Sequence, residues 1–163
     1  MLQTLIRAVA IGAGATLLLD LWSLLLKRLG IPSLDFAMLG RWIGHLRHGR
    51  WSHRRIADAA PVRGEAWIGW TAHYSIGVGF TGLLVWWYGA GWLRSPTLAP
   101  ALTVGILTAV APLFVLHPAL GAGIAASKTP APLFNSAKSV VSHIVFGIGL
   151  YLSALAAAAL MGA

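Results

Sequence analysis

Four runs of apolar residues, each close to the length of a membrane-spanning helix, divide this sequence. They cover about residues 5–26, 66–88, 98–120 and 139–161. A helix needs about 20 apolar residues to cross the hydrocarbon core of a bilayer. Only 10% of the 163 residues are charged, whereas soluble domains carry about 25%. The sequence therefore predicts an all-α integral membrane protein, a four-helix bundle that forms a single membrane domain over residues 1–163.

A basic segment, residues 27–65, separates the first two runs and holds most of the chain's 12 lysines and arginines. Apolar residues recur at helical spacing from Phe36 to Leu46, after Asp35 and after Ser33, a candidate N-cap. We interpret this stretch as a short amphipathic helix on the membrane surface, with its arginines toward anionic lipid headgroups. A solvated basic loop is the alternative. Membrane topology and headgroups explain the net charge of +8 better than nucleic acid does.

The distribution of positive charge predicts the topology. Besides residues 27–65, the connection between the third and fourth runs carries Lys128 and Lys138, whereas the opposite side has only Arg7 and Arg94. Lysine and arginine concentrate on the cytoplasmic side of membrane proteins. We therefore expect a cytoplasmic basic segment and both termini outside the cytoplasm. The third run also contains Pro100, Pro112 and Pro118, which predict kinks.

A heptapeptide pattern, His-x-x-x-Gly-x-Gly, occurs twice. It reads HYSIGVG at residues 73–79 and HIVFGIG at residues 143–149. Each histidine shares a helix face with the glycine one turn away, which suggests two parallel halves. A chance match in a glycine-rich chain is the alternative. Glycines let helices approach closely in lipid, so these positions predict packing seams and allow a homo-oligomer. The predicted packing glycines are Gly77, Gly79, Gly147 and Gly149.

Each apolar run carries one ionisable side chain in its predicted cytoplasmic half. These side chains are Asp20, His73, His117 and His143. An aspartate in a spanning helix costs about 2.5–3.5 kcal/mol on insertion scales, so it normally faces protein or water and has a partner. We expect one of the three histidines to be the partner of Asp20. The four groups are the candidate ligand or proton site.

Several functions fit such a site. The first is a small transporter or channel-like protein that moves protons with a solute or ion, because histidine titrates near neutral pH. In this reading Asp20 is the counter-charge, His73 and His143 are the repeat-related pair, and His117 lies on the kinked helix. The alternatives are a transition-metal or haem site on the same three histidines, an accessory subunit of a larger membrane complex, or a layer that only fixes helix packing.

Other chemistry finds little support in the sequence. The absence of cysteine excludes thiolate metal sites and cysteine nucleophiles. No Gly-x-Ser-x-Gly elbow or phosphate loop is present, and no run holds a His-x-x-x-His pair. The sequence thus favours a non-enzymatic role and assigns no catalytic residue. Its expected surroundings are the lipid bilayer and, at the basic segment, anionic headgroups.

Several short segments together resemble a family of small bacterial inner-membrane proteins known as domain of unknown function 2938. The resemblance covers nearly the whole chain and implies four spans in a bacterial inner membrane, but no activity. The segments are Asp20-Leu21-Trp22, Lys27-Arg28-Leu29-Gly30, Gly40-Arg41-Trp42, Gly64-Glu65, Ala72-His73-Tyr74-Ser75-Ile76-Gly77, His117-Pro118-Ala119-Leu120-Gly121 and His143-x-x-x-Gly147.

Overall fold

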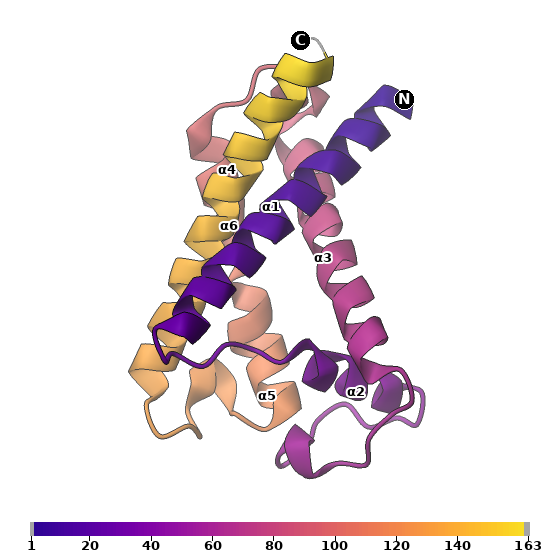
Figure 1. Cartoon of the computed structure of the whole chain (residues 1–163), viewed down its shortest axis with the longest axis vertical. Helices are drawn as coiled ribbons and strands as arrows, with labels where there is room; N and C mark the ends of the chain where they lie inside the picture. The colour runs from indigo at the N-terminus through magenta and orange to yellow at the C-terminus, as the bar shows by residue number, and fades with distance from the viewer. Residues whose placement is uncertain (1, 162–163) are drawn as a thin grey trace. The chain divides into compact units, whose positions relative to one another are not determined.

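The structure, a computed structural model, describes residues 2–161, and these contain helices and no strand (Figure 1). The prediction of an all-α protein is confirmed. The elements in chain order are α1 (Leu2–Arg28), α2 (Phe36–Leu46), η1 (Ile56–Asp58), α3 (Glu65–Tyr88), η2 (Ala90–Leu93), α4 (Leu98–Thr108), η3 (Ala111–Leu116), α5 (His117–Leu120), η4 (Ile124–Ala126) and α6 (Pro132–Met161).

Three helical stretches of the described chain are long and apolar enough to cross a membrane: Leu2–Arg28, Leu98–Leu120 and Pro132–Met161. They correspond to three of the four predicted spans. The fourth predicted span, residues 66–88, is the 24-residue helix α3. It is long enough, but its four tryptophans and its polar residues make it less apolar than the other three.

The stretch Leu98–Leu120 is a continuous helical path with a change in hydrogen bonding. Pro112 has no N–H, so it cannot make the α-helical bond back to Thr108. From Ala111 to Leu116 the backbone forms a π-helix, and the His117 N–H then donates to the Pro112 carbonyl. Proline and π-turns are recognised causes of helix kinks. The departure from regular helix that the prolines predict is therefore present.

The chain forms two compact units. The first contains residues 2–31, 74–108 and 141–161 of the described chain. Its core is aliphatic and aromatic, with contributions from α1, α3, η2, α4 and α6. The core residues are Ile11, Ala15, Leu84, Trp92, Leu93, Ala101, Val104, Phe146, Leu150, Ala154 and Ala157.

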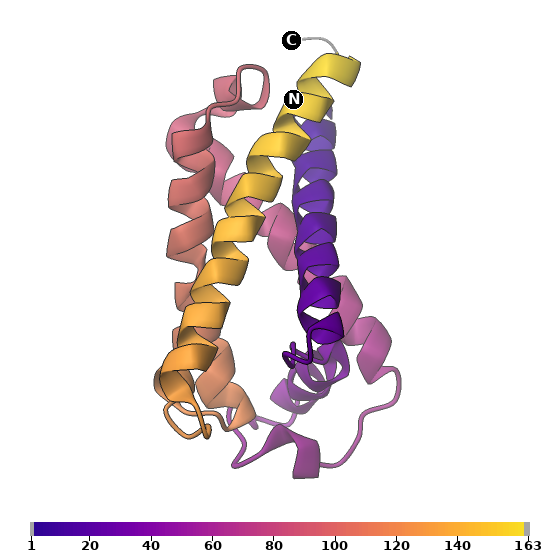
Figure 2. The same ribbon diagram turned by 60° about the vertical axis from the view of Figure 1, so that its left-hand side comes forward.

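Glycines bring the long helices of the first unit into close contact. Gly12 of α1 meets α3 so closely that a Cβ there would lie 2.6 Å from the Val78 Cα. Between α4 and α6, a Cβ on Gly105 would lie 2.7 Å from the Gly147 Cα. Figure 2 shows α6 between α4 and α1. In lipid, the hydrophobic effect does not drive helices together. Close approach at glycines allows dispersion forces to stabilise the helix contacts instead.

The glycines of the repeated heptapeptide differ in their surroundings. Gly77 lies against Thr16 of α1, and Gly147 lies against α4. A Cβ on Gly149 would lie 3.0 Å from the Ala15 Cα. Among the described residues, nothing outside the helix lies within 4 Å of a Cβ placed on Gly79. Both copies of the pattern thus place their first glycine in a contact between long helices.

The second unit contains Pro32–His73 and Ala109–Val140. In it, α2 packs on the first turns of α3 through paired glycines. A Cβ on Gly40 would lie 2.7 Å from the Gly69 amide nitrogen, and Phe36 contacts the Trp70 ring at a centroid distance of 4.6 Å. Leu39 is buried. The apolar face of α2 therefore packs against protein, and its position on a membrane surface stays a prediction.

The predicted cap of α2 is wrong by two residues. The N-cap is Asp35, whose carboxylate accepts a hydrogen bond from the Ala37 N–H at 2.9 Å. Aspartate and serine are both favoured at this position. The sequence offered both, and Asp35 lies directly before the first helical residue, whereas Ser33 is two residues further away.

Candidate functional site

Asp20 of α1 is bound by a tyrosine from α3. The Tyr74 hydroxyl donates to Asp20 Oδ2 at 2.9 Å, and both side chains are partly buried in the first unit. A phenol that donates to a carboxylate forms a charge-assisted hydrogen bond, which is stronger than one between neutral groups. The expected histidine partner of Asp20 stays a prediction, and the sequence did not single out Tyr74.

His143 of α6 is oriented by a threonine from α4. Thr108 Oγ1 donates to the Gly105 carbonyl at 2.7 Å and lies 3.0 Å from His143 Nδ1. A hydroxyl has one proton, so Thr108 must accept from His143, which fixes the Nδ1–H tautomer. Proton uptake by this imidazole would then occur at Nε2. Phe80 and Phe146 approach the ring at centroid distances of 6.4 Å.

Two further polar contacts connect helices of the first unit. The Trp22 indole N–H of α1 donates to Ser142 Oγ of α6 at 3.1 Å. At the other end of α1, Arg7 is only 8% exposed and donates to the carbonyls of Leu93 and Met161. The sequence analysis used Arg7 only as a marker of topology. An arginine within the first two turns of an apolar helix was the available signal for a structural role.

The four predicted site residues are divided between the units. Asp20 and His143 belong to the first unit, and His73 and His117 to the second. The layer of four groups therefore stays a prediction. Within residues 2–161, no three histidine, aspartate or glutamate side chains form a group that could hold a metal ion.

His73 and His117 have different surroundings within the second unit. The His73 ring stacks on Phe36 of α2, with centroids 4.1 Å apart and an interplanar angle of 26°. His117 begins α5, and its Nδ1 is buried without a hydrogen-bond partner among residues 2–161. Buried polar atoms normally have a partner in the protein or in ordered water. His117 Nδ1 is therefore a polar atom that water or a ligand would satisfy.

An ion pair between α2 and α3 organises the second unit. The Arg41 guanidinium donates to both carboxylate oxygens of Glu65, at 2.6 and 2.9 Å, and the Val62 N–H donates to Glu65 Oε2 at 2.9 Å. The pKa of Glu65 is lowered to about 2, mainly by the hydrogen bonds from Arg41 and also by the bond from Val62, against the opposing effect of burial. The same contact raises the pKa of Arg41.

A histidine pair lies beside this ion pair. His45 Nδ1 is 2.8 Å from His53 Nε2, and His45 Nε2 is 3.0 Å from the Ala60 carbonyl. A carbonyl only accepts, so His45 donates from Nε2 and, when neutral, accepts at Nδ1 from His53. His53 Nδ1 is then buried and unsatisfied within the described residues. His45 belongs to α2 and His53 to the loop that follows it, so this contact holds the loop against α2.

A family model described as "Protein of unknown function (DUF2938)" matches residues 9–157. No curated protein and no solved structure matches the chain. The match covers most of the helices of both units, including all four predicted site residues. It confirms the resemblance seen in the short sequence segments. The chain therefore belongs to the family of proteins of unknown function DUF2938.

Proposed function

We propose that this protein is a small channel-like protein or transporter that moves protons, alone or with a small solute or ion, across a bacterial inner membrane. Its proton site contains Asp20 and His143 with their partners Tyr74 and Thr108. His73 and His117 are further candidate members from the sequence.

The observation that carries the proposal is the position of two ionisable groups in the apolar first unit. Asp20 lies on α1 and His143 on α6, the two longest of the apolar helices, and each has a hydroxyl partner on another helix. Ionisable groups inside spanning helices are costly and are characteristic of proton and ion pathways. With its tautomer fixed by Thr108, His143 takes up or releases a proton at Nε2 while Nδ1–H keeps its partner.

The proposal includes α3 as a fourth span. Arg7 contacts the Leu93 and Met161 carbonyls, so the start of α1, the connection after α3 and the end of α6 meet at one end of the first unit (Figure 1). In this proposal the start of α1 and the end of α6 lie on the same side of the membrane, which fits an even number of crossings. We expect tags at both ends to be outside the cytoplasm, together with a cytoplasmic basic segment.

Proton flux into liposomes tests the function. The full chain is reconstituted with a trapped pH-sensitive dye, and flux is driven by a potassium diffusion potential. We expect flux above that of empty liposomes, and a loss of roughly tenfold or more in Asp20→Asn and in His143→Gln.

Thr103→Val is the matched control for Thr108→Val. Thr103 also lies on α4, and its hydroxyl donates to the Ala99 carbonyl of its own helix. Thr108→Val should reduce flux, while Thr103→Val should retain it. Flux no higher than in empty liposomes, or equal flux in Asp20→Asn and wild type, would overturn the proposal.

A further inference from the structure

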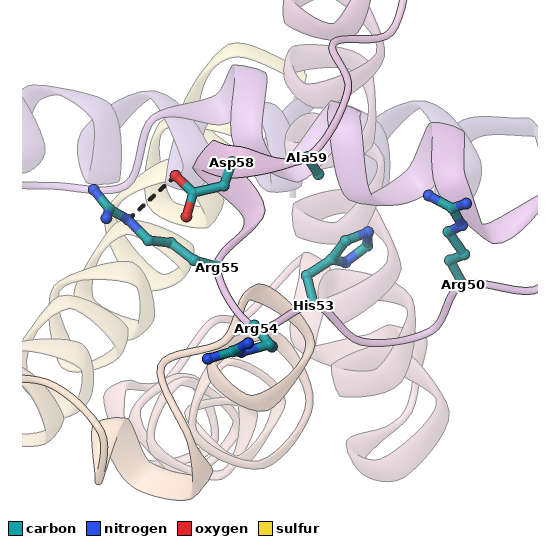
Figure 3. Close-up of a pocket in the computed structure, with 6 residues that line it drawn as sticks. All are labelled: Arg50, His53, Arg54, Arg55, Asp58 and Ala59. Carbon is teal, nitrogen blue, oxygen red and sulfur yellow. Dashed lines mark ion pairs between the residues drawn. The ribbon is translucent and has the colours of Figure 1, made fainter.

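The loop between α2 and α3 forms a basic pocket in the second unit. Its volume is about 660 Å³, and Figure 3 shows the residues around it, with Arg55 extending toward Asp58. The basic pocket is lined by Arg50, His53, Arg54, Arg55, Asp58 and Ala59. None of these residues belongs to the proposed proton site.

The backbone on one side of the basic pocket is held by the turn after α5. The His53 N–H donates to the Ala119 carbonyl at 2.9 Å. Gly121 has φ +97°, and a Cβ there would lie within 2.8 Å of the His53 carbonyl oxygen and closer still to that of Arg54. Only glycine allows both this conformation and this approach. These contacts fix the backbone from which Arg54 extends.

The other side of the basic pocket is held by α2. His45 binds the His53 ring, as described above. The Arg41 guanidinium donates to the carbonyls of Ile56, Ala57 and Ala59, at 3.4, 3.2 and 3.2 Å. A loop backbone held from both sides is preorganised, which reduces the entropy lost on binding a ligand, but Arg50 and Arg54 extend on opposite sides of His53 in Figure 3 and must turn toward a shared ligand.

The charge of the basic pocket is strongly positive. Three arginines line it against one carboxylate, and Arg55 and Asp58 form a long, exposed ion pair at 3.7 Å. Within residues 2–161, Arg50 and Arg54 form no ion pair with a carboxylate. Guanidinium groups bind phosphate oxygens with paired hydrogen bonds. A phosphate group would supply the acceptors that these arginines lack.

We propose that the basic pocket binds a phosphate-bearing anion, with Arg50 and Arg54 as its main ligands and Arg55 as a third. The anion is either a phospholipid headgroup or a soluble phosphate, since both present the same oxygens. This inference does not depend on the proposed proton site, because the residues and the unit are different.

Binding to the full chain in detergent tests this site. One arm adds short-chain phosphatidylglycerol or phosphatidylcholine and counts bound lipid by native mass spectrometry. The other arm titrates inorganic phosphate and pyrophosphate by calorimetry. Phosphatidylglycerol binding without phosphate binding identifies a headgroup site, and binding of the soluble anions identifies a soluble ligand. Either result supports the proposal when it depends on the arginines of the basic pocket.

Matched variants establish that dependence. Arg50→Gln and Arg54→Gln should each weaken binding roughly tenfold, the effect of one charge-assisted hydrogen bond. Asp58→Asn removes the only acidic side chain lining the pocket and should tighten binding. Arg63→Gln makes the same charge change in the same loop outside the pocket and should bind like wild type. Binding of neither probe, unchanged binding in the Arg50→Gln/Arg54→Gln double variant, or an equal loss in Arg63→Gln would overturn the proposal.

Discussion

Each of the two units is stabilised internally by a different kind of contact. In the first unit, the long helices meet at glycines and around an aliphatic core. In the second unit, the single side chain of Arg41 joins Glu65 to three loop carbonyls. Long helices satisfy their own backbone groups and need only close packing, whereas a loop has carbonyls that require partners. The first unit should therefore respond most to added volume, and the second to changes in charge.

The largest expected effect follows from adding volume between α4 and α6. In Gly105→Val, the new Cβ would lie 2.7 Å from both the Gly147 Cα and the His143 carbonyl oxygen. Because neither backbone can move without displacing its helix, we expect a loss of stability of about 3 kcal/mol or more. Unfolding in detergent by titration with a denaturing surfactant measures it.

Gly79→Val is the control for this prediction. It makes the same substitution on α3, at a position with nothing outside its helix within 4 Å. We expect the free energy of unfolding to change by less than about 1 kcal/mol in this variant, because valine and glycine differ little in helix propensity. Equal losses at both positions would show that close approach of α4 and α6 is not what holds the first unit.

The second expected effect is acid sensitivity at the ion pair of the second unit. The pKa of Glu65 lies near 2 in the folded protein, against an ordinary value of 4.5. A lowered folded-state pKa contributes stability above the ordinary value, and this contribution is lost as pH falls from about 4.5 to about 2. Hydrogen exchange at the Val62 N–H, corrected for intrinsic rates, should therefore accelerate in that window.

Glu65→Gln removes the titrating group and serves as the test of cause. It should lower stability at neutral pH by about 2 kcal/mol, less than for a fully buried pair because both side chains keep some exposure. Its exchange at Val62 should then show no further change between pH 4.5 and 2. Asp35→Asn alters another carboxylate of the second unit and should retain the acid sensitivity. If Glu65→Gln behaves like wild type, the ion pair does not hold this loop.

The same comparison separates what the sequence could predict from what it could not. Apolar length indicated where the long helices lie, because the thickness of a bilayer sets the length of a spanning helix, but α6 begins at Pro132, seven residues before the predicted run. The prolines of the third run likewise predicted a departure from regular helix, which the structure has at Ala111–Leu116. By contrast, the folded loop of the second unit depends on Arg41 reaching residues up to 24 positions away. A count of arginines assigned Arg41 to headgroups, since charge alone does not show which carbonyls need donors.

The candidate site also contains residues that the sequence singled out and residues that it did not. Asp20 and His143 stand out in the sequence as candidates, because an ionisable group in an apolar helix is conspicuous. Their partners Tyr74 and Thr108 do not, because hydroxyl side chains are common in such helices and their direction depends on helix rotation. In the structure, Asp20 lies one helical turn from Thr16, which contacts Gly77, so both residues lie on the face of α1 that meets α3.

The smallest expected effect compares one indole hydrogen bond in each unit. Trp22→Phe removes the bond to Ser142 in the first unit, and Trp42→Phe removes the bond to the Trp51 carbonyl in the second. Hydrogen bonds between membrane helices average about 0.6 kcal/mol, so Trp22→Phe should cost about that much in surfactant unfolding. Ser142→Ala and the double variant complete a mutant cycle, and their coupling should be of the same size. A coupling several times larger would mean that polar contacts, and not glycine packing, dominate the first unit, and the contrast between the units would then fail.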